Sequence, residues 1–302
     1  MTLAILRRIW NDLIPIVAGM VPVVVIFAFD WWERKRRNGR TKSPQAEKLL
    51  RPPGHSLSIE LDELVDHATL RTLGAFGLCE LAGALFFNSS DRIPAIWSVS
   101  SLVIGFGFGV AGACLTVRVI RDFRRYHNLR LGLRGEQAVA EASQEVADCG
   151  YRAFHDFPGG ENWNIDHIVV GPPGVFLIET KARSRVRPRR GQQQAAHVVY
   201  VLADALRFPN GDNLEAIPQA ERNAKWLAGF LTKKTGENVE IEALVVLPGW
   251  FVETKQPPPN GTMVMNANYL AKYLRGRPVR LPESQVRRII AQLDDMCRDM
   301  EF

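Results

Sequence analysis

Long apolar runs before about residue 118 constrain the fold of this chain more than any other feature. Residues 13–29 and 95–117 carry no charged side chain, and residues 72–88 carry only Glu80. A helix needs about 20 mostly apolar residues to cross roughly 30 Å of hydrocarbon. We therefore expect three transmembrane helices at these positions, within a membrane region that covers residues 1–125.

Basic residues flank the apolar runs unevenly. Arginines and lysines cluster at residues 34–42 and 118–125, whereas the short segment 88–94 has only Arg92. The positive-inside rule then places the loop 31–70 and everything after about residue 118 in the cytoplasm, in a multi-pass protein of the cell (inner) membrane. A two-span arrangement, in which the first run lies in the interface, is the alternative. A signal peptide is disfavoured because bulky, basic residues follow the first run, without a small-residue cleavage site.

Composition excludes some classes of protein. The chain has 302 residues, of which 46% are hydrophobic and 23% charged, so it is not a disordered polymer. The four cysteines form no CxxC pair, which argues against a zinc ribbon and a disulfide framework. The net charge of +6 favours an anionic partner, either nucleic acid or a lipid surface.

From residue 126 to residue 302, helical and strand patterns alternate as in a soluble domain. Helical periodicity covers residues 133–150, 217–236 and 283–300. Strand patterns cover residues 151–157, 165–170, 175–181 and 240–250, with a further short one at 263–266. Residues 192–206 fit either a strand or a helix. This order predicts an α/β (α+β) domain with a mixed sheet flanked by helices and a core at 134–250.

Two of these strands form a hairpin whose ends are charged. If Val170 pairs with Val175 across the turn GPPG, antiparallel pairing keeps the sum of residue numbers constant and places Asp166 opposite Glu179. Lys181 is two residues after Glu179 and therefore projects from the same face. Both strands are apolar on both faces, so we expect a buried hairpin whose terminal charges need partners.

The charges at the hairpin ends predict a metal site. Two carboxylates held this close repel each other unless a cation lies between them. Oxygen ligands suit Mg²⁺ or Mn²⁺, and a nearby lysine can orient or deprotonate a water or stabilise charge on a phosphate. The pattern therefore predicts metal-dependent phosphodiester hydrolysis. The alternative is that the charges only mark strand ends that meet solvent.

The hairpin block NIDHIVVGPPGVFLIETKA, preceded by RGEQAVAE and followed by IPQAERNAKWLAGFL, resembles the nuclease-related domain (NERD) over about residues 134–247. That family is a branch of the PD-(D/E)xK, restriction-endonuclease-like fold. The resemblance implies that the metal ligands are Glu136, Asp166 and Glu179. It also implies that Lys181 and Gln219 complete the catalytic set. The long arginine-rich segment after Lys181 departs from the family pattern.

Five arginines follow Lys181 and predict contacts with a DNA backbone, with lipid headgroups as the alternative. They are Arg183, Arg185, Arg187, Arg189 and Arg190. Two other residues are expected nearby: Asp156 as an outer carboxylate, and His167 in a structural role on the opposite strand face.

Together these features predict a membrane-anchored, Mg²⁺- or Mn²⁺-dependent nuclease that acts on DNA at the cytoplasmic face, with DNA and the lipid bilayer as partners. A non-catalytic nucleic-acid-binding protein that retains the nuclease fold is the alternative. A scaffolding or sensor membrane protein is another, and Glu80 is its main support, because an ionisable group inside a span is costly.

Overall fold

The computed structural model describes residues 32, 48–87, 95–160, 163–185 and 197–300. The predicted first span, residues 13–29, lies outside the described residues. The described chain forms two compact units. One contains residues 62–87 and 95–127, and the other contains residues 48–61 together with 128–300.

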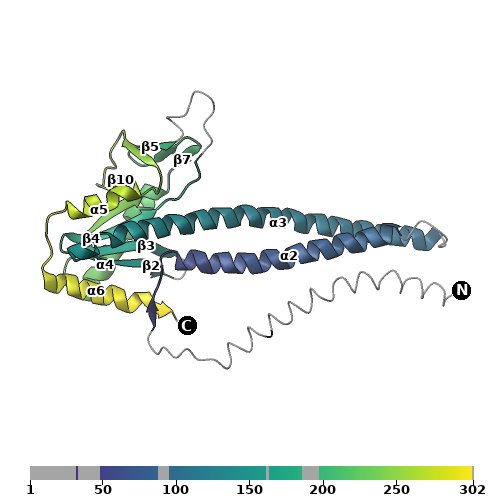
Figure 1. The fold of residues 1–302 in the computed structure, drawn as a ribbon, viewed down its shortest axis with the longest axis horizontal. Helices are drawn as coiled ribbons and strands as arrows, with labels where there is room; N and C mark the ends of the chain where they lie inside the picture. The colour runs from purple at the N-terminus through teal and green to yellow at the C-terminus, as the bar shows by residue number, and fades with distance from the viewer. Residues whose placement is uncertain (1–31, 33–47, 88–94, 161–162, 186–196, 301–302) are drawn as a thin grey trace. The chain divides into compact units, whose positions relative to one another are not determined.

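Two helices are longer than the sequence pattern predicts (Figure 1). Helix α2 covers His55–Phe87, and α3 covers Ala95–Gln144. In the sequence, proline comes just before the first residue of each helix. Proline lacks the backbone N–H and fits only the first turn of a helix, so a helix does not extend far to its N-terminal side. No proline follows in α3, and the arginines and leucines of residues 118–133 are good helix formers. The expected break between the third span and the first helix of the soluble domain is therefore absent.

Within the described residues, one helical stretch is long and apolar enough to cross a membrane, Leu102–Gln144 in α3. Large apolar side chains along it are exposed, including Val103, Ile104, Phe106 and Val110. The second predicted span is 72–88, and its described part, residues 72–87 in α2, does not meet the same standard. The described residues therefore support one candidate span, and not the multi-pass arrangement that the sequence predicted.

Contacts between α2 and α3 are close in the first unit. A Cβ on Gly112 would lie 2.8 Å from Sγ of Cys79, so this glycine lets the two helices approach. Further along, Nη1 of Arg71 lies 2.5 Å from Oδ2 of Asp122, which is mostly buried. These contacts pair the two helices through packing and through charge.

The second unit is built on a five-stranded mixed sheet. Its strands, in spatial order, are β10 (Met263–Met265), β8 (Ile241–Val246), β4 (Gly174–Thr180), β3 (Trp163–Gly171) and β2 (Arg152–Gly160). The first three run parallel, and the last two continue antiparallel. The predicted hairpin is therefore the join between the parallel and the antiparallel half of the sheet.

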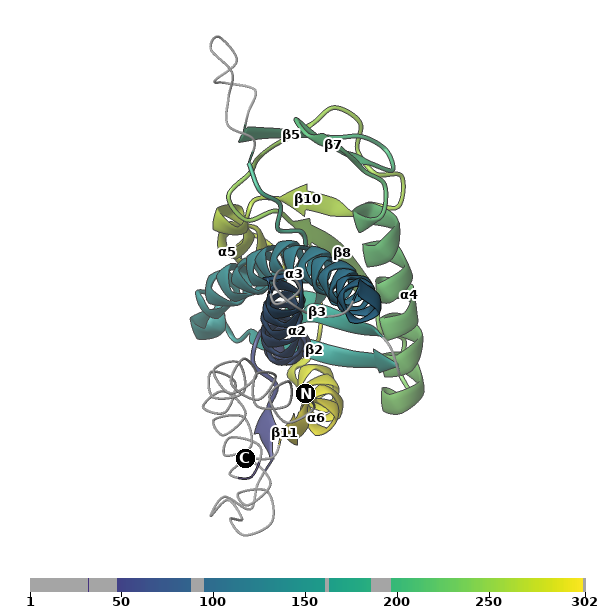
Figure 2. The ribbon, with the colours of Figure 1, turned by 90° about the vertical axis from the view of Figure 1, so that its right-hand side faces the viewer.

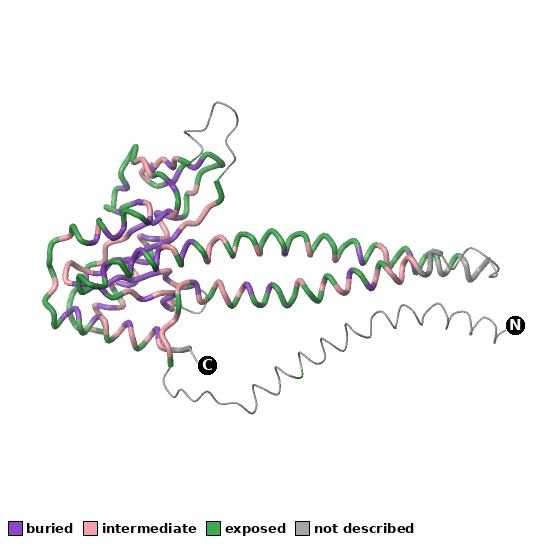
Figure 3. Tube along the Cα trace, viewed as in Figure 1, coloured by how far each residue is buried: buried purple, intermediate pink, exposed green. Residues whose placement is uncertain are grey.

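Helices cover both faces of this sheet (Figure 2). Residues of α4 (Ala216–Thr235) and α6 (Glu283–Cys297) share one hydrophobic cluster with the strands. The end of α3 and α5 (Ala267–Arg275) share the other. Buried residues concentrate in the central strands (Figure 3). The predicted α/β class, with a mixed sheet flanked by helices, is confirmed.

Several short elements were not predicted. A four-stranded sheet contains β7 (Gly211–Asn213), β6 (Leu206–Phe208), β5 (Val198–Val201) and β9 (Phe251–Thr254), so the ambiguous segment 192–206 holds a strand. A two-residue strand, β1 (Leu49–Leu50), pairs with β11 (Arg298–Met300) directly after α6. The segment before α2 thus adds to the second unit.

A close approach between α3 and the end of β4 brings two parts of the site together. A Cβ on Gly135 would lie only 2.5 Å from the Cβ of Ala182. Glycine at this position therefore allows the next residue, Glu136, to sit beside the chain that follows β4.

Gly135→Ala should lower the stability of the protein by about 1–3 kcal/mol, because the added methyl group overlaps a neighbour that is not a flexible side-chain end. Gly229→Ala in α4 is the matched control. It meets open space and should be neutral or gain up to about 1 kcal/mol from helix propensity. Thermal unfolding of the detergent-solubilised proteins measures both, and equal melting temperatures would contradict this account of the α3–β4 contact.

Candidate functional site

The observed strand register confirms the geometry expected for the hairpin. Val170 pairs with Val175, and the antiparallel ladder continues to the pair of His167 with Ile178. The next positions along the two strands are Asp166 and Glu179. The backbone N–H of Thr180 donates to Oδ2 of Asp166 at 2.7 Å, which fixes this carboxylate at the end of β4.

Lys181 joins the hairpin to helix α4. Its Nζ donates to Oε1 of Glu179 at 2.7 Å and to Oε1 of Gln219 at 3.2 Å. Gln219 lies near the start of α4, whose buried face packs on the sheet. The structure therefore brings together Glu179, Lys181 and Gln219, as the sequence predicted.

Glu136 reaches the site from α3 and is buried. The backbone N–H of Gly54 hydrogen bonds to its carboxylate. Oε2 of Glu136 and Oε2 of Glu179 are both buried and have no hydrogen-bond partner within the described part of the chain. Unpaired buried acceptors are costly, so these two atoms are suited to a ligand that carries positive charge or a donor.

The carboxylates of the site lie within electrostatic reach of one another. Burial raises the pKa of Glu136 to about 7, and the negative charges of Asp156 and Glu179 add to this effect. The pKa of Asp166 is also raised well above its ordinary value, first by burial and then by the negative charges of Glu179 and Glu136. The pKa of Glu179 is raised by burial too, although Lys181 opposes the rise. A cation between these groups would relieve their repulsion.

Lys181 remains a cation at neutral pH. Burial alone would lower its pKa, but the carboxylates of Glu179 and Asp166 outweigh burial, so the pKa is raised. A lysine that keeps its proton can stabilise negative charge but cannot act as a base. Of the two roles that the sequence left open for Lys181, the observed contacts favour charge stabilisation.

The carboxylates suit a hard divalent cation, although they do not form a finished coordination shell. Among the described residues, no three His, Cys, Asp or Glu side chains are arranged so that they could hold a metal ion as they stand. Mg²⁺, however, commonly keeps several waters and binds through one or two carboxylates. The unpartnered oxygens of Glu136 and Glu179 fit that pattern, with Asp166 as the third candidate ligand.

The arginines after Lys181 have contacts within their own domain where they are described. Arg183 donates to the carbonyls of Asn210 and Gly211 and lies 4.7 Å from the ring centre of Phe208. Arg185 donates to the carbonyl of Gly249. The other three, Arg187, Arg189 and Arg190, lie outside the described residues. Contact of this segment with nucleic acid stays a prediction.

His167 has a partner on the neighbouring strand β2. It is fully buried, and its Nδ1 is 2.8 Å from Nδ1 of His155 across the β2–β3 pair. Burial lowers the pKa of His155 to about 4 and that of His167 well below its ordinary value. Both imidazoles are therefore neutral near pH 7. The arrangement agrees with the structural role expected for His167.

Two residues that act on the carboxylates of the site, Arg222 and Gly54, were not predicted from the sequence. Exposed Arg222 of α4 acts on Glu179 through its charge, and it follows the predicted Gln219 by about one helical turn, a spacing that could have identified it. Gly54 comes from a stretch rich in proline and glycine that was assigned to a cytoplasmic loop, and nothing in its pattern points to the site.

Comparison with known families agrees with this geometry. A family model described as the nuclease-related domain (NERD) matches residues 131–248. This segment is similar to the nuclease-related domain. It includes all five residues of the predicted catalytic set, so the predicted NERD resemblance is confirmed, whereas the PD-(D/E)xK assignment stays a prediction. No curated protein and no solved structure matches the chain.

Because the pKa of Glu136 is raised, the stability of the protein should depend on pH. Its protonated form is favoured by folding, so its contribution to stability is present below about pH 4.5 and is lost as the pH rises through about 7. The melting temperature of the metal-free protein should therefore fall between pH 5 and pH 8. Glu136 accounts for on the order of 2–3 kcal/mol of this loss.

Glu136→Gln should flatten this pH dependence, because an amide does not ionise. Exposed Glu141 lies on the same helix, and Glu141→Gln serves as the control that should leave the dependence unchanged. Melting curves in the presence of a chelator measure the effect. A Glu136→Gln profile that falls as steeply as that of the wild type would show that the burial of Glu136 has no such consequence.

Proposed function

We propose that this protein is a membrane-anchored nuclease that hydrolyses phosphodiester bonds of DNA at the cytoplasmic face with Mg²⁺ or Mn²⁺. The observation that carries the proposal is the cluster at the end of β4, where Asp166, Glu179 and Lys181 meet and a buried carboxylate oxygen has no partner. The similarity of residues 131–248 to the nuclease-related domain supports the same class of chemistry.

Each residue has a defined task in this proposal. Glu136, Asp166 and Glu179 would hold the metal ion, which when bound would supply an activated water and offset charge on the phosphate. The N–H of Thr180 keeps the Asp166 carboxylate in place. Lys181 stays protonated and stabilises negative charge on a phosphate oxygen, and Oε1 of Gln219 orients its ammonium group.

The anionic substrate is drawn to this site by positive charge. Exposed Arg222 lies close enough to lower the pKa of Glu179, so it is suited to contact a phosphate next to the site. Arg183 and Arg185 after Lys181 add positive charge, and the net charge of the whole chain is +6. Contacts of this kind depend on salt and do not read sequence.

Anchoring in the membrane is part of the proposal. The exposed apolar side chains of α3 between Leu102 and Val117 are suited to lipid, and the apolar run at residues 13–29 adds a further candidate span. With arginines at residues 118–125, the positive-inside rule favours a cytoplasmic location for the nuclease-related domain, in a multi-pass protein of the cell membrane.

Cleavage assays with the full-length protein in detergent micelles test the catalytic proposal. Supercoiled plasmid, linear duplex and single-stranded DNA are each incubated with Mg²⁺ or Mn²⁺. Asp166→Asn, Glu179→Gln and Lys181→Met should each lower the rate by at least about a hundredfold, because each removes a group placed for the transition state. Glu221→Gln is the control, since this half-buried acid of α4 bonds Asn260 and Thr262 and should leave the rate unchanged.

Two outcomes would contradict catalysis. If the wild type cuts none of these substrates above the level of Asp166→Asn, the protein is not a nuclease on DNA. Retention of DNA without cleavage, with a steep dependence on salt and no need for metal, would instead favour a nucleic-acid-binding module that retains the fold.

Extraction of membranes tests the anchoring proposal. The protein should stay in the membrane pellet after alkaline carbonate treatment and should be released only by detergent, because spanning helices do not dissociate in aqueous buffer. Release of the intact protein by carbonate alone would show that it does not span the bilayer.

A further inference from the structure

Asp156 is a buried carboxylate with a strained backbone, one strand away from Asp166. It is the only residue other than glycine with a positive φ among the described positions, at 50°, and its exposure is 0%. The pairing of β2 with β3 skips it between His155 and Phe157, which places it across from Asp166. Left-handed backbone is tolerated by aspartate but costs about 1 kcal/mol or more, so other contacts must hold it.

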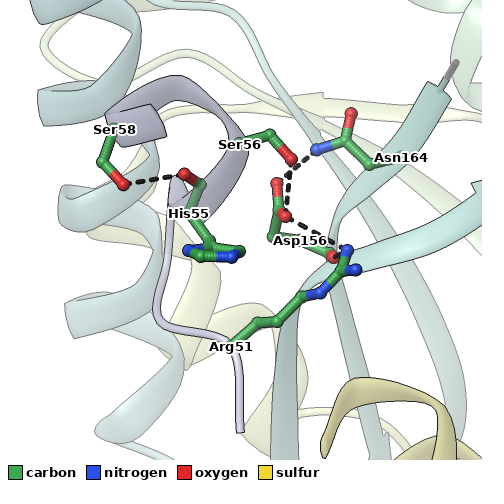
Figure 4. A network of polar contacts seen from close by, with 6 residues as sticks. All are labelled: Arg51, His55, Ser56, Ser58, Asp156 and Asn164. Atoms are coloured by element: carbon green, nitrogen blue, oxygen red, sulfur yellow. Dashed lines mark hydrogen bonds and ion pairs between the residues drawn. The ribbon is translucent and has the colours of Figure 1, made fainter. Parts of the chain in front are cut away.

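The contacts that hold Asp156 come mainly from Arg51, just before α2, and from Ser56 in the first turn of α2 (Figure 4). Nη1 of Arg51 donates to the carbonyl oxygen of Asp156 at 2.9 Å and lies 3.4 Å from Oδ2. Oγ of Ser56 donates to Oδ2 at 2.7 Å, and Nδ2 of Asn164 donates to Oδ1. Arg51 thus binds the strained backbone and the carboxylate of the same residue.

The same segment also touches Glu136. Gly54 has φ of 71°, and a Cβ there would lie 2.3 Å from Cδ1 of Leu133 and 3.7 Å from Oε2 of Glu136. Its backbone therefore lies directly against α3, and its N–H bonds the Glu136 carboxylate. Three residues of one short segment, Arg51, Gly54 and Ser56, thus fix two neighbouring acidic groups.

We propose that residues 51–56, named here the strap, are a positioning segment of the metal site: Arg51 and Ser56 hold Asp156, Gly54 holds Glu136, and together they keep Glu136 in a position to bind a divalent cation. The inference rests on the proposed function, because it concerns the same site. Arg51 and Asp156 act through Glu136, so they are positioning residues and not catalytic ones.

The physical reason lies in charge and in backbone geometry. Asp156 acts on Glu136 through its negative charge, and the Arg51 guanidinium compensates part of that charge. Without Arg51, the buried Asp156 carboxylate would keep only its bonds to Ser56 and Asn164, and its strained backbone would lose the donor on its carbonyl. Groups that orient metal ligands typically change metal affinity by about ten- to a hundredfold when removed.

Binding of Mn²⁺ to the full-length protein in detergent micelles tests the strap. Arg51→Gln should weaken binding about ten- to a hundredfold, measured by electron paramagnetic resonance of free Mn²⁺ during titration. Arg51→Lys should recover part of the affinity, because an ammonium can still pair with Asp156. Arg152→Gln is the matched control. Arg152 lies on β2, the strand that carries Asp156, and the substitution breaks its partly exposed ion pair with Asp294 of α6. This variant should bind Mn²⁺ as tightly as the wild type does.

The outcomes separate the strap from the proposed function. Unchanged Mn²⁺ affinity in Arg51→Gln would overturn the proposed role of the strap, and so would an equal loss of affinity in Arg152→Gln. Neither result would contradict the metal site itself. If the wild type binds no Mn²⁺, the proposed function fails, and a double-mutant cycle then tests only whether the strap holds Glu136. The melting temperatures of Arg51→Gln, Glu136→Gln and the double variant should be non-additive, and additive losses would overturn it.

Discussion

Three carboxylates, of which Glu136 and Glu179 are buried and Asp166 is half-buried, lie near one lysine, and the second unit depends on this constraint. Glu179 is almost fully buried. Burial raises the pKa of both Glu136 and Asp166, and the charge of Glu179 adds to the rise. Lys181 supplies one positive charge, which cannot balance all three acids when they are ionised. Repulsion of this kind would push the elements that carry these groups apart, so the surrounding packing must resist it.

The fold resists this repulsion through elements that cannot easily separate. Asp166 lies within β3 and Glu179 near the end of β4, and the paired residues between them, 167–170 and 175–178, are all buried. Glu136 lies on α3 at the point where Gly135 lets the helix touch the chain after β4. The N–H groups of Thr180 and Gly54 each bind one of the acids. Electrostatic strain is thus distributed over hydrophobic packing and backbone hydrogen bonds, which is typical of a site prepared for a cation.

The geometry of the hairpin could be predicted from local sequence patterns, whereas contacts between residues far apart in the sequence could not. The constant index sum of an antiparallel pair predicted the neighbours of Asp166 and Glu179, because register depends only on the turn and the alternation of side chains. The strap contacts Asp156 across about a hundred residues of sequence, and its prolines and glycine resemble any surface loop. The short strands β5, β6, β7 and β9 carry too few residues for a clear period, and the length of α3 was hidden by its change from apolar to basic composition.

The order of segments along the chain gives the strap its significance. The first unit contains residues 62–87 and 95–127, which lie in the sequence between residues 48–61 and 128–300 of the second unit. The nuclease-related segment at 131–248 is therefore not the whole of its domain, because Arg51, Gly54 and Ser56 contribute bonds to its acidic residues from the other side of the insertion. A fragment that begins at residue 126 would leave Asp156 with one donor, Asn164, out of the three side chains that hold it. Activity lost in such a fragment would reflect an incomplete site, and only the full chain can show whether the carboxylates at the end of β4 bind metal.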